Sequence, residues 1–187
     1  IQRARSFAEA VGIMAHEYGH VLSLPDLFDK DFTDAGDVLD PELDSAGIGY
    51  WGLMAHGARG WGNAGGPVPL CAWSLEQLGW IGVTNEDLAV ISENVRDAIF
   101  DDGSNGGKVY KIPAQAADEY FLVEHRRSGN SYYERDLPAG GLLIWHINNT
   151  YFGNNDEKAK RVDLVCADGL YGDAGFPLGQ RPVAELG

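Results

Sequence analysis

Residues 16–20 read His16-Glu17-Tyr18-Gly19-His20, and they lie inside a longer stretch whose apolar residues follow a helical period. Over residues 3–23, large apolar side chains recur at alternating steps of four and three, at Phe7, Val11, Met14, Tyr18 and Val21. This spacing predicts one amphipathic helix that buries these five side chains. The helix is expected to end at Ser23-Leu24-Pro25, because the residue before a proline is pushed out of the helical region.

A long irregular stretch rich in Gly and Asp follows, from about residue 26 to residue 69. Loops of this length in compact domains are usually functional, so this stretch is expected to line a site or to order around ions. A second helix is predicted over residues 69–78, with Gly79 as its stop signal.

After residue 84 the sequence changes to short β-type runs separated by turn clusters such as residues 102–107. The predicted strands are Ala89–Ser92, Lys108–Ile112, Tyr120–His125, Gly141–Ile147 and Val162–Val165. We therefore predict an α+β protein with a helix-and-loop region at residues 1–84 and a β-rich region at residues 85–187.

The pentapeptide at residues 16–20 fits the H-E-x-x-H pattern on a predicted helix. Because residues four apart lie one turn above each other on a helix, the imidazoles of His16 and His20 can reach one tetrahedral ion. Zn²⁺ held in this way lowers the pKa of a bound water to about 7, and Glu17 is placed to act as general base toward that water. Inside a helix, glycine is less stable than alanine by about 0.8–1.0 kcal/mol. The presence of Gly19 therefore suggests that another segment approaches the helix backbone closely at this position.

A catalytic zinc site needs a third protein ligand. Asp26 lies six residues after His20, beyond the predicted helix end, where a turn can bring its carboxylate back to the ion. In the long form of the motif a glycine stands where this chain has Ser23. Alternative third ligands are Glu76, His56 and carboxylates of the acidic loop. Met54 is placed like the methionine of a Met-turn, the apolar floor beneath a zinc site.

The charge of the chain restricts its partners. Its 187 residues contain 14 Lys plus Arg against 28 Asp plus Glu, a formal net charge of −14. Such an acidic chain repels phosphate backbones and anionic lipids, so nucleic acid is not an expected partner, and no apolar run is long enough for membrane insertion. A run of carboxylates is either a solvated loop or a Ca²⁺ site; it comprises Asp29, Asp31, Asp34, Asp37, Asp40, Glu42 and Asp44.

Other polar residues are interpreted as structural. Glu124 and His125 point to opposite faces of a predicted strand, and with His146 they are expected to make structural hydrogen bonds. Arg126 and Arg127, at a strand end, are expected at the surface. Cys71 and Cys166 form either a disulfide or two buried thiols.

Several blocks of the sequence, in order, resemble the immune inhibitor A-like family of secreted bacterial zinc metallopeptidases. The blocks are residues 16–20, 24–29, 51–54, 72–74 with 78–80, 119–124, 137–147, 168–169 and 175–177. The resemblance implies a metzincin-like active-site helix with the lower half of the catalytic domain, followed by the β-rich region. It also implies peptide-bond hydrolysis outside a bacterial or archaeal cell, with Zn²⁺ and a possible role for Ca²⁺.

The helical start at Ile1 without a preceding strand suggests a fragment of a longer protein, since metzincin-like domains have a sheet before the active-site helix. Two other functions stay open. One is a noncatalytic binding or adhesion module that keeps the metallopeptidase fold, against which the presence of Glu17 argues. The other is a structural metal protein that binds calcium and carries the H-E-x-x-H pattern by chance.

Overall fold

The computed structural model describes residues 4, 6–31, 45, 47–63, 65–92, 107–129, 131–156 and 158–165. The first helix, α1 (Phe7–Val21), begins after Ser6, whose hydroxyl oxygen accepts a hydrogen bond of 3.1 Å from the backbone N–H of Glu9. This contact satisfies one of the amides that a helix leaves unpaired at its start. The predicted helix over residues 3–23 is thus confirmed, with its ends shortened.

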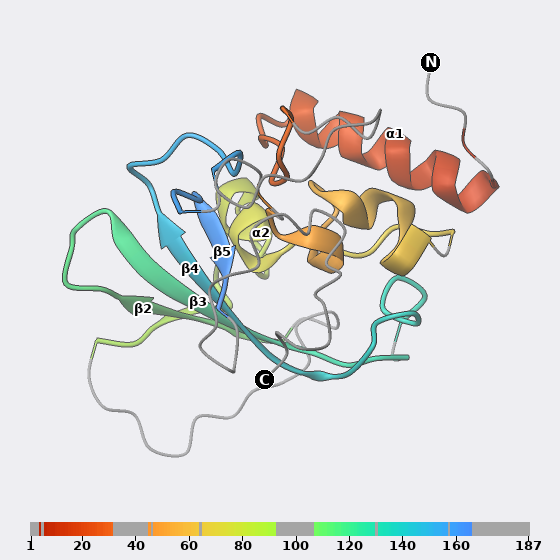
Figure 1. Cartoon of the computed structure of the whole chain (residues 1–187). Helices are drawn as coiled ribbons and strands as arrows, with labels where there is room; N and C mark the ends of the chain where they lie inside the picture. Colours follow the sequence, from red (N-terminus) through yellow and green to blue (C-terminus); the bar gives the residue numbers. More distant parts are fainter. Residues whose placement is uncertain are drawn as a thin grey trace, which may run out of the picture.

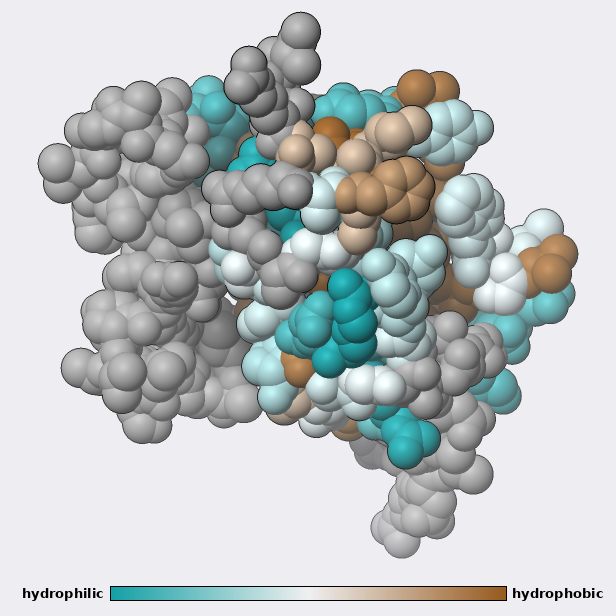
Figure 2. Space-filling view, turned by 90° about the vertical axis from the view of Figure 1, so that its right-hand side faces the viewer, coloured by the Kyte–Doolittle hydropathy of each residue, from teal (hydrophilic) through white to brown (hydrophobic). Residues whose placement is uncertain are grey.

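The prediction of which face of α1 is buried was wrong. Phe7, Met14, Tyr18 and Val21 are between 62 % and 86 % exposed, and Val11 is 38 % exposed. The buried positions are instead Glu9, Gly12, His16 and Gly19. A helical period identifies the residues that share a face, but it does not say on which side the chain packs. Figure 2 faces the side on which α1 begins and shows hydrophobic side chains exposed between hydrophilic ones.

The segment after α1 is irregular in its described parts, as predicted, and contains three short 3₁₀-helices. These are η1 (Gly49–Trp51), η2 (His56–Arg59) and η3 (Trp61–Asn63). The second α-helix, α2 (Ala72–Leu78), begins three residues later than expected and ends at Gly79. Gly79 has a φ of 71°, a left-handed conformation that glycine adopts without steric cost.

The β-rich region forms one five-stranded sheet in the order β1-β2-β3-β4-β5. Its strands are β1 (Leu88–Val90), β2 (Val109–Pro113), β3 (Glu119–Arg126), β4 (Gly141–Asn148) and β5 (Val162–Leu164). The pair β1–β2 is parallel and the other pairs are antiparallel. All five predicted strands are confirmed to within two residues at each end, and the α+β class with them.

One hydrophobic core joins the two predicted regions. Leu24, Leu27 and Met54 from the first region belong to the same buried cluster as Leu122 and Trp145 of the sheet. In Figure 1 α2 lies between the sheet and the 3₁₀-helices, with α1 on the far side of those helices. The division at residue 84 stays a prediction, and both parts contribute to a shared interior.

Two further expectations concern membranes and cysteines. Within the part of the chain that the structure describes, no helix has both the length and the apolar composition needed to cross a bilayer. Cys71 is a buried free thiol, whereas Cys166 lies outside the described residues. The disulfide alternative is therefore contradicted, and the buried-thiol alternative is confirmed for Cys71 alone.

Candidate metal centre

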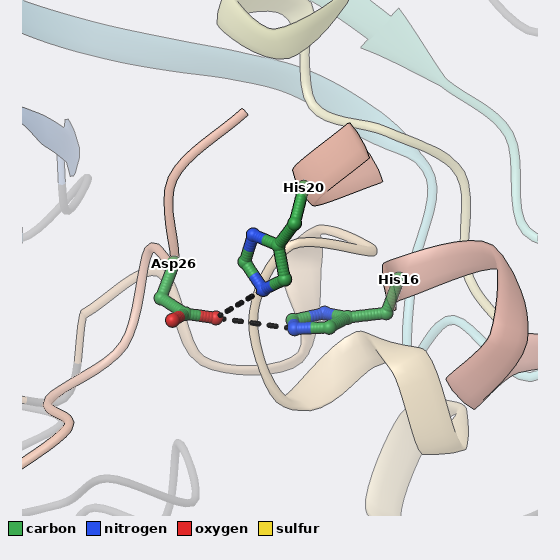
Figure 3. Close-up of side chains that lie close together, drawn as sticks. All are labelled: His16, His20 and Asp26. Carbon is green, nitrogen blue, oxygen red and sulfur yellow. Dashed lines mark hydrogen bonds and ion pairs between the residues drawn. The ribbon is translucent and has the colours of Figure 1, made fainter. Parts of the chain in front are cut away.

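Three side chains predicted as metal ligands lie together at the C-terminal half of α1. The Nε2 atoms of His16 and His20 are 3.1 Å and 3.2 Å from Oδ1 of Asp26. Figure 3 shows both imidazoles, one turn apart on the helix, facing the same carboxylate oxygen from the loop beyond it. One ligand atom from each residue lies within 4.8 Å of the other two, and no other such group of three occurs among the described residues.

Both histidines are held by backbone carbonyls through their second ring nitrogen. Nδ1 of His16 lies 2.8 Å from the carbonyl oxygen of Leu53, and Nδ1 of His20 lies 2.8 Å from that of Leu24. A carbonyl can only accept, so each Nδ1 carries the hydrogen, and in a neutral ring Nε2 then holds the lone pair. This arrangement orients metal-binding imidazoles in proteins. Sequence reasoning missed both carbonyls, since a backbone acceptor has no residue signature.

Met54 packs against α1 at Gly19, the residue before His20. Met54 is fully buried, and a Cβ added at Gly19 would lie 2.4 Å from its sulfur. The glycine inside the HExxH stretch is therefore explained by the close approach of the methionine. The role of Met54 as the apolar floor of a zinc site stays a prediction.

Ser23 makes the turn that brings Asp26 back toward the helix. Its φ is 70°, in the left-handed region that favours glycine. The serine adopts this conformation at a cost of roughly 1–2 kcal/mol. The departure from glycine in the long motif therefore does not prevent the turn.

The segment that carries Asp26 is tied to the core on both sides. The backbone N–H of Leu27 donates to the carbonyl of Met54 at 2.8 Å, and the Leu27 side chain is fully buried. The amide of Asn154 donates to the carbonyl of Leu27 at 3.4 Å. Lys30 Nζ lies 3.9 Å from the second oxygen of Asp26. Asp26 is thus held beside the histidines through its neighbour Leu27, which contacts two separate segments.

The charges of the cluster shift two pKa values in opposite directions. Burial alone would lower the pKa of His16, but its hydrogen bonds to Asp26 and Leu53 and the charges of Asp26 and Glu17 raise it above 6.5. Burial alone would raise the pKa of Asp26, but the hydrogen bond from His16 and the charges of His20, His16 and Lys30 lower it below 3.8. In the metal-free chain the pair therefore stabilises the fold most between pH 3.8 and 6.5. This contribution is lost as Asp26 is protonated at lower pH and as His16 is deprotonated at higher pH.

Replacing Asp26 by Asn is expected to lower the pKa of His16 in the metal-free chain. The substitution removes a negative charge and a charge-assisted hydrogen bond while the burial of His16, which disfavours the imidazolium, remains. The imidazole resonances of His16 followed by NMR across pH would measure the change. An unchanged or higher midpoint would contradict the contact between the two side chains.

Glu17 stands beside this group without being part of it. Its side chain is exposed and makes no hydrogen bond or ion pair to another described residue. Its charge contributes to the raised pKa of His16. A carboxylate placed next to the ligands yet not tied to any of them is available to a water molecule.

The alternative third ligands lie elsewhere or outside the described residues. Glu76 accepts hydrogen bonds of 2.6 Å from Lys111 and from the Tyr120 hydroxyl. The His56 ring packs against Phe28 and Tyr50, with ring centroids 5.4 Å and 6.1 Å away. Asp29 is buried and accepts from the backbone N–H groups of Asp31 and Ser45. Asp31 Oδ2 accepts a hydrogen bond of 2.8 Å from the Asn155 amide. The other carboxylates of the acidic loop, Asp34, Asp37, Asp40, Glu42 and Asp44, are outside the described residues, so calcium binding there stays a prediction.

The donor set of this centre fits Zn²⁺. Two imidazole nitrogens and one carboxylate oxygen are the ligands of many catalytic zinc sites, which keep a further position for water or substrate. The carbonyls that hold both Nδ1 atoms complete the second layer of contacts that such sites use.

Comparison with known proteins supports the resemblance stated from the sequence. Residues 5–81, which include all three candidate ligands, match the sequence model described as immune inhibitor A peptidase M6, catalytic domain. The chain is also 32 % identical over 87 residues to the pre-pro-metalloprotease PrtV of Vibrio cholerae serotype O1, in strains M66-2 and ATCC 39315 / El Tor Inaba N16961. That match covers 43 % of this chain and 8 % of the relative. No solved structure matches the chain.

Proposed function

We propose, on the premise that residues 5–81 are similar to the M6 peptidase catalytic domain, that this chain carries the active centre of a zinc-dependent endopeptidase. His16, His20 and Asp26 would hold the metal, and Glu17 would be the general base. The observation that carries the proposal is the group of three ligand atoms within 4.8 Å, with both histidines held through Nδ1 by carbonyls.

Zn²⁺ bound at such a centre acts as a Lewis acid toward a carbonyl and lowers the pKa of water to about 7. In the proposed reaction the carboxylate of Glu17 accepts a proton from the attacking water as the water oxygen adds to the carbonyl carbon of the peptide bond. Glu17 then delivers this proton to the amide nitrogen, so that the C–N bond breaks and the amine leaves. The exposed position of Glu17 allows both transfers without breaking an existing ion pair.

Further parts of the proposal rest on the family resemblance. The substrate would be a protein or peptide, and the protein would act outside the cell. Residues 1–84 would form the active-site helix and lower half of a metzincin-like domain, and residues 85–187 would support them. The chain spans about a tenth of the relatives that it matches, so the activity of the whole protein is part of this proposal. The alternative is a noncatalytic binding or adhesion module that keeps this fold.

Zinc content tests the assignment of the ligands. Purified chain loaded with Zn²⁺ is expected to contain one zinc per molecule by elemental analysis. The zinc should be lost in His16→Ala, because one of three protein ligands is removed, and retained in Glu17→Gln. The matched control is Glu76→Gln, which changes a rejected alternative ligand and should keep the metal.

Two outcomes would contradict the proposed centre. Zinc retained by His16→Ala would place the metal elsewhere, and zinc absent from the unmodified chain would reject a site formed by these residues. Zinc bound with the expected dependence, but without any peptide hydrolysis by the chain or by a longer natural polypeptide that contains it, would favour the binding module.

A further inference from the structure

A buried ion pair lies on one face of β3, remote in sequence from the metal centre. Glu124 and Arg126 are each only 2 % exposed, which contradicts the expectation that Arg126 is a surface residue. The Nε and Nη2 atoms of Arg126 donate to the two carboxylate oxygens of Glu124 at 2.9 Å and 3.1 Å. Removing two charges from water costs several kcal/mol per ion, so a buried pair is weak support for stability alone.

Both residues of the pair form hydrogen bonds with the segment that leads into α2. Nη2 of Arg126 also donates to the carbonyl of Leu70 at 2.8 Å. Oε1 of Glu124 accepts from the backbone N–H of Ala72 at 3.2 Å and from Nε1 of Trp145 at 2.8 Å. The Arg126 guanidinium thus binds the carbonyl of Leu70, and the Glu124 carboxylate binds the N–H of Ala72. Because these two backbone groups are only two residues apart, the contacts fix the backbone between Leu70 and Ala72.

This fixed segment is connected to the metal centre by backbone hydrogen bonds. The carbonyl of Pro69, next to Leu70, accepts from the N–H of Leu53 at 3.1 Å. The carbonyl of the same residue, Leu53, accepts from Nδ1 of His16 at 2.8 Å. The two segments also pack closely, because a Cβ added at Gly52 would lie 3.4 Å from Cβ of Cys71. The position of the Leu53 carbonyl therefore depends on the segment that Glu124 and Arg126 hold.

We propose that Glu124 and Arg126 are positioning residues for the metal ligand His16. Their side chains hold the backbone of residues 70–72 by hydrogen bonds. This backbone positions Leu53 through the hydrogen bond to Pro69. The Leu53 carbonyl in turn sets the tautomer and the orientation of the His16 ring. The inference rests on the proposed function only in that His16 is taken as a zinc ligand. It assigns to the β-rich region a direct part in building the centre.

Zinc affinity measured by competition with a chromophoric chelator tests this role. Arg126→Met is expected to weaken zinc binding about tenfold. This is the lower end of the roughly 10–100-fold cost of losing an outer-layer partner of a metal-binding histidine, because the direct partner of His16, the Leu53 carbonyl, is displaced and not removed. Glu76→Gln is the matched control. It removes a carboxylate whose side chain is 8 % exposed and which links α2 to Lys111 and Tyr120. Within the described part of the chain, neither of these hydrogen bonds leads to Leu53. Its zinc affinity should stay within twofold of that of the unmodified chain.

A double variant separates positioning from stability. Arg126→Met leaves the carboxylate of Glu124 buried without its cation, which can destabilise the whole fold. The combination of Glu124→Leu with Arg126→Met removes both charges, so Glu124 is no longer left as a buried carboxylate without its cation. The fully buried Glu134, whose Oε1 lies 3.9 Å from Nε of Arg126, loses this cation in the single and in the double variant alike, so the two variants can be compared. We expect this double variant to remain folded, with one cooperative thermal transition, and still to bind zinc about tenfold more weakly than the unmodified chain.

The ring nitrogens of His16 give a readout that does not need metal. At a pH well above the titration midpoint of His16, two-bond ¹H–¹⁵N spectra of the metal-free chain should show hydrogen on Nδ1, and a mixture of tautomers in the double variant. A folded double variant with unchanged His16 resonances and unchanged zinc affinity would overturn the inference. If the unmodified chain binds no zinc, the proposed function fails, whereas the His16 spectra still decide whether Glu124 and Arg126 position the ring.

Discussion

Glu17→Gln is expected to reduce kcat/KM for peptide hydrolysis by about 10²–10⁴-fold, the usual contribution of a general acid–base residue. Glutamine has nearly the same shape but accepts no proton from the attacking water. The side chain of Glu17 makes no hydrogen bond to another described residue, so the fold and the three proposed ligands should be unaffected. The measurement uses a quenched fluorescent peptide library with the zinc-loaded chain and with any longer natural polypeptide that contains it.

The control for this experiment is Glu86→Gln, which neutralises an exposed carboxylate in the turn before β1. It should leave both the rate and the zinc content unchanged. A Glu17→Gln variant with the full rate would remove Glu17 from the chemistry. A variant that also loses zinc would show instead that Glu17 is needed for metal binding.

Gly12→Ala is expected to destabilise the fold by about 1–3 kcal/mol, the usual cost of overpacking. A Cβ at position 12 would lie 1.9 Å from the carbonyl oxygen of Ala58 and 3.1 Å from Cβ of Pro67. Since the first of these is backbone, α1 or η2 must move. Thermal unfolding followed by circular dichroism should show a lower Tm, by roughly 2–4 °C for each kcal/mol in a chain of this size.

Intrinsic helix propensity makes the opposite prediction for the same substitution, because alanine is favoured over glycine by about 1 kcal/mol within a helix. The sign of the change therefore distinguishes close packing of α1 on η2 from an unpacked helix. Gly153→Ala serves as the matched control, since a Cβ there meets no atom within 4 Å. A higher Tm for Gly12→Ala would mean that α1 does not approach Ala58 as described.

Local signals in the sequence predicted most of the elements. The five strands and α2 were predicted because alternation, turn clusters and Gly79 act over a few residues. The buried side of α1 was not predicted correctly. It is decided by Gly12 and Gly19, whose missing side chains let Ala58 and Met54 approach the helix. The apolar row from Phe7 to Val21 has the correct period and lies on the exposed side.

In the candidate site, too, the local contacts could be predicted from the sequence and the distant ones could not. His16, His20 and Asp26 lie within eleven residues of sequence, so the helical turn and the tight bend at Ser23 suffice to predict that they meet. The carbonyl of Leu53 comes from 37 residues away and has no side-chain signature. Arg126 was placed at the surface because nothing near it in sequence indicates that residues 70–72 pack over it. Contacts of this kind depend on the tertiary fold.

The hydrogen bond between Asn154 and Leu27 has a consequence for the order of folding. It joins residues 127 positions apart, and the same amide group pairs with Val162 at the start of β5. Contacts this distant in sequence form late, since a long loop must close before they contribute any free energy. During synthesis the HExxH helix leaves the ribosome before β5, and the contact from Asn154 to the loop that carries Asp26 forms only once β5 has emerged. A nascent chain that stops before residue 154 can therefore form the contact between Leu27 and Met54, but it lacks the Asn154 amide that also holds the loop carrying Asp26.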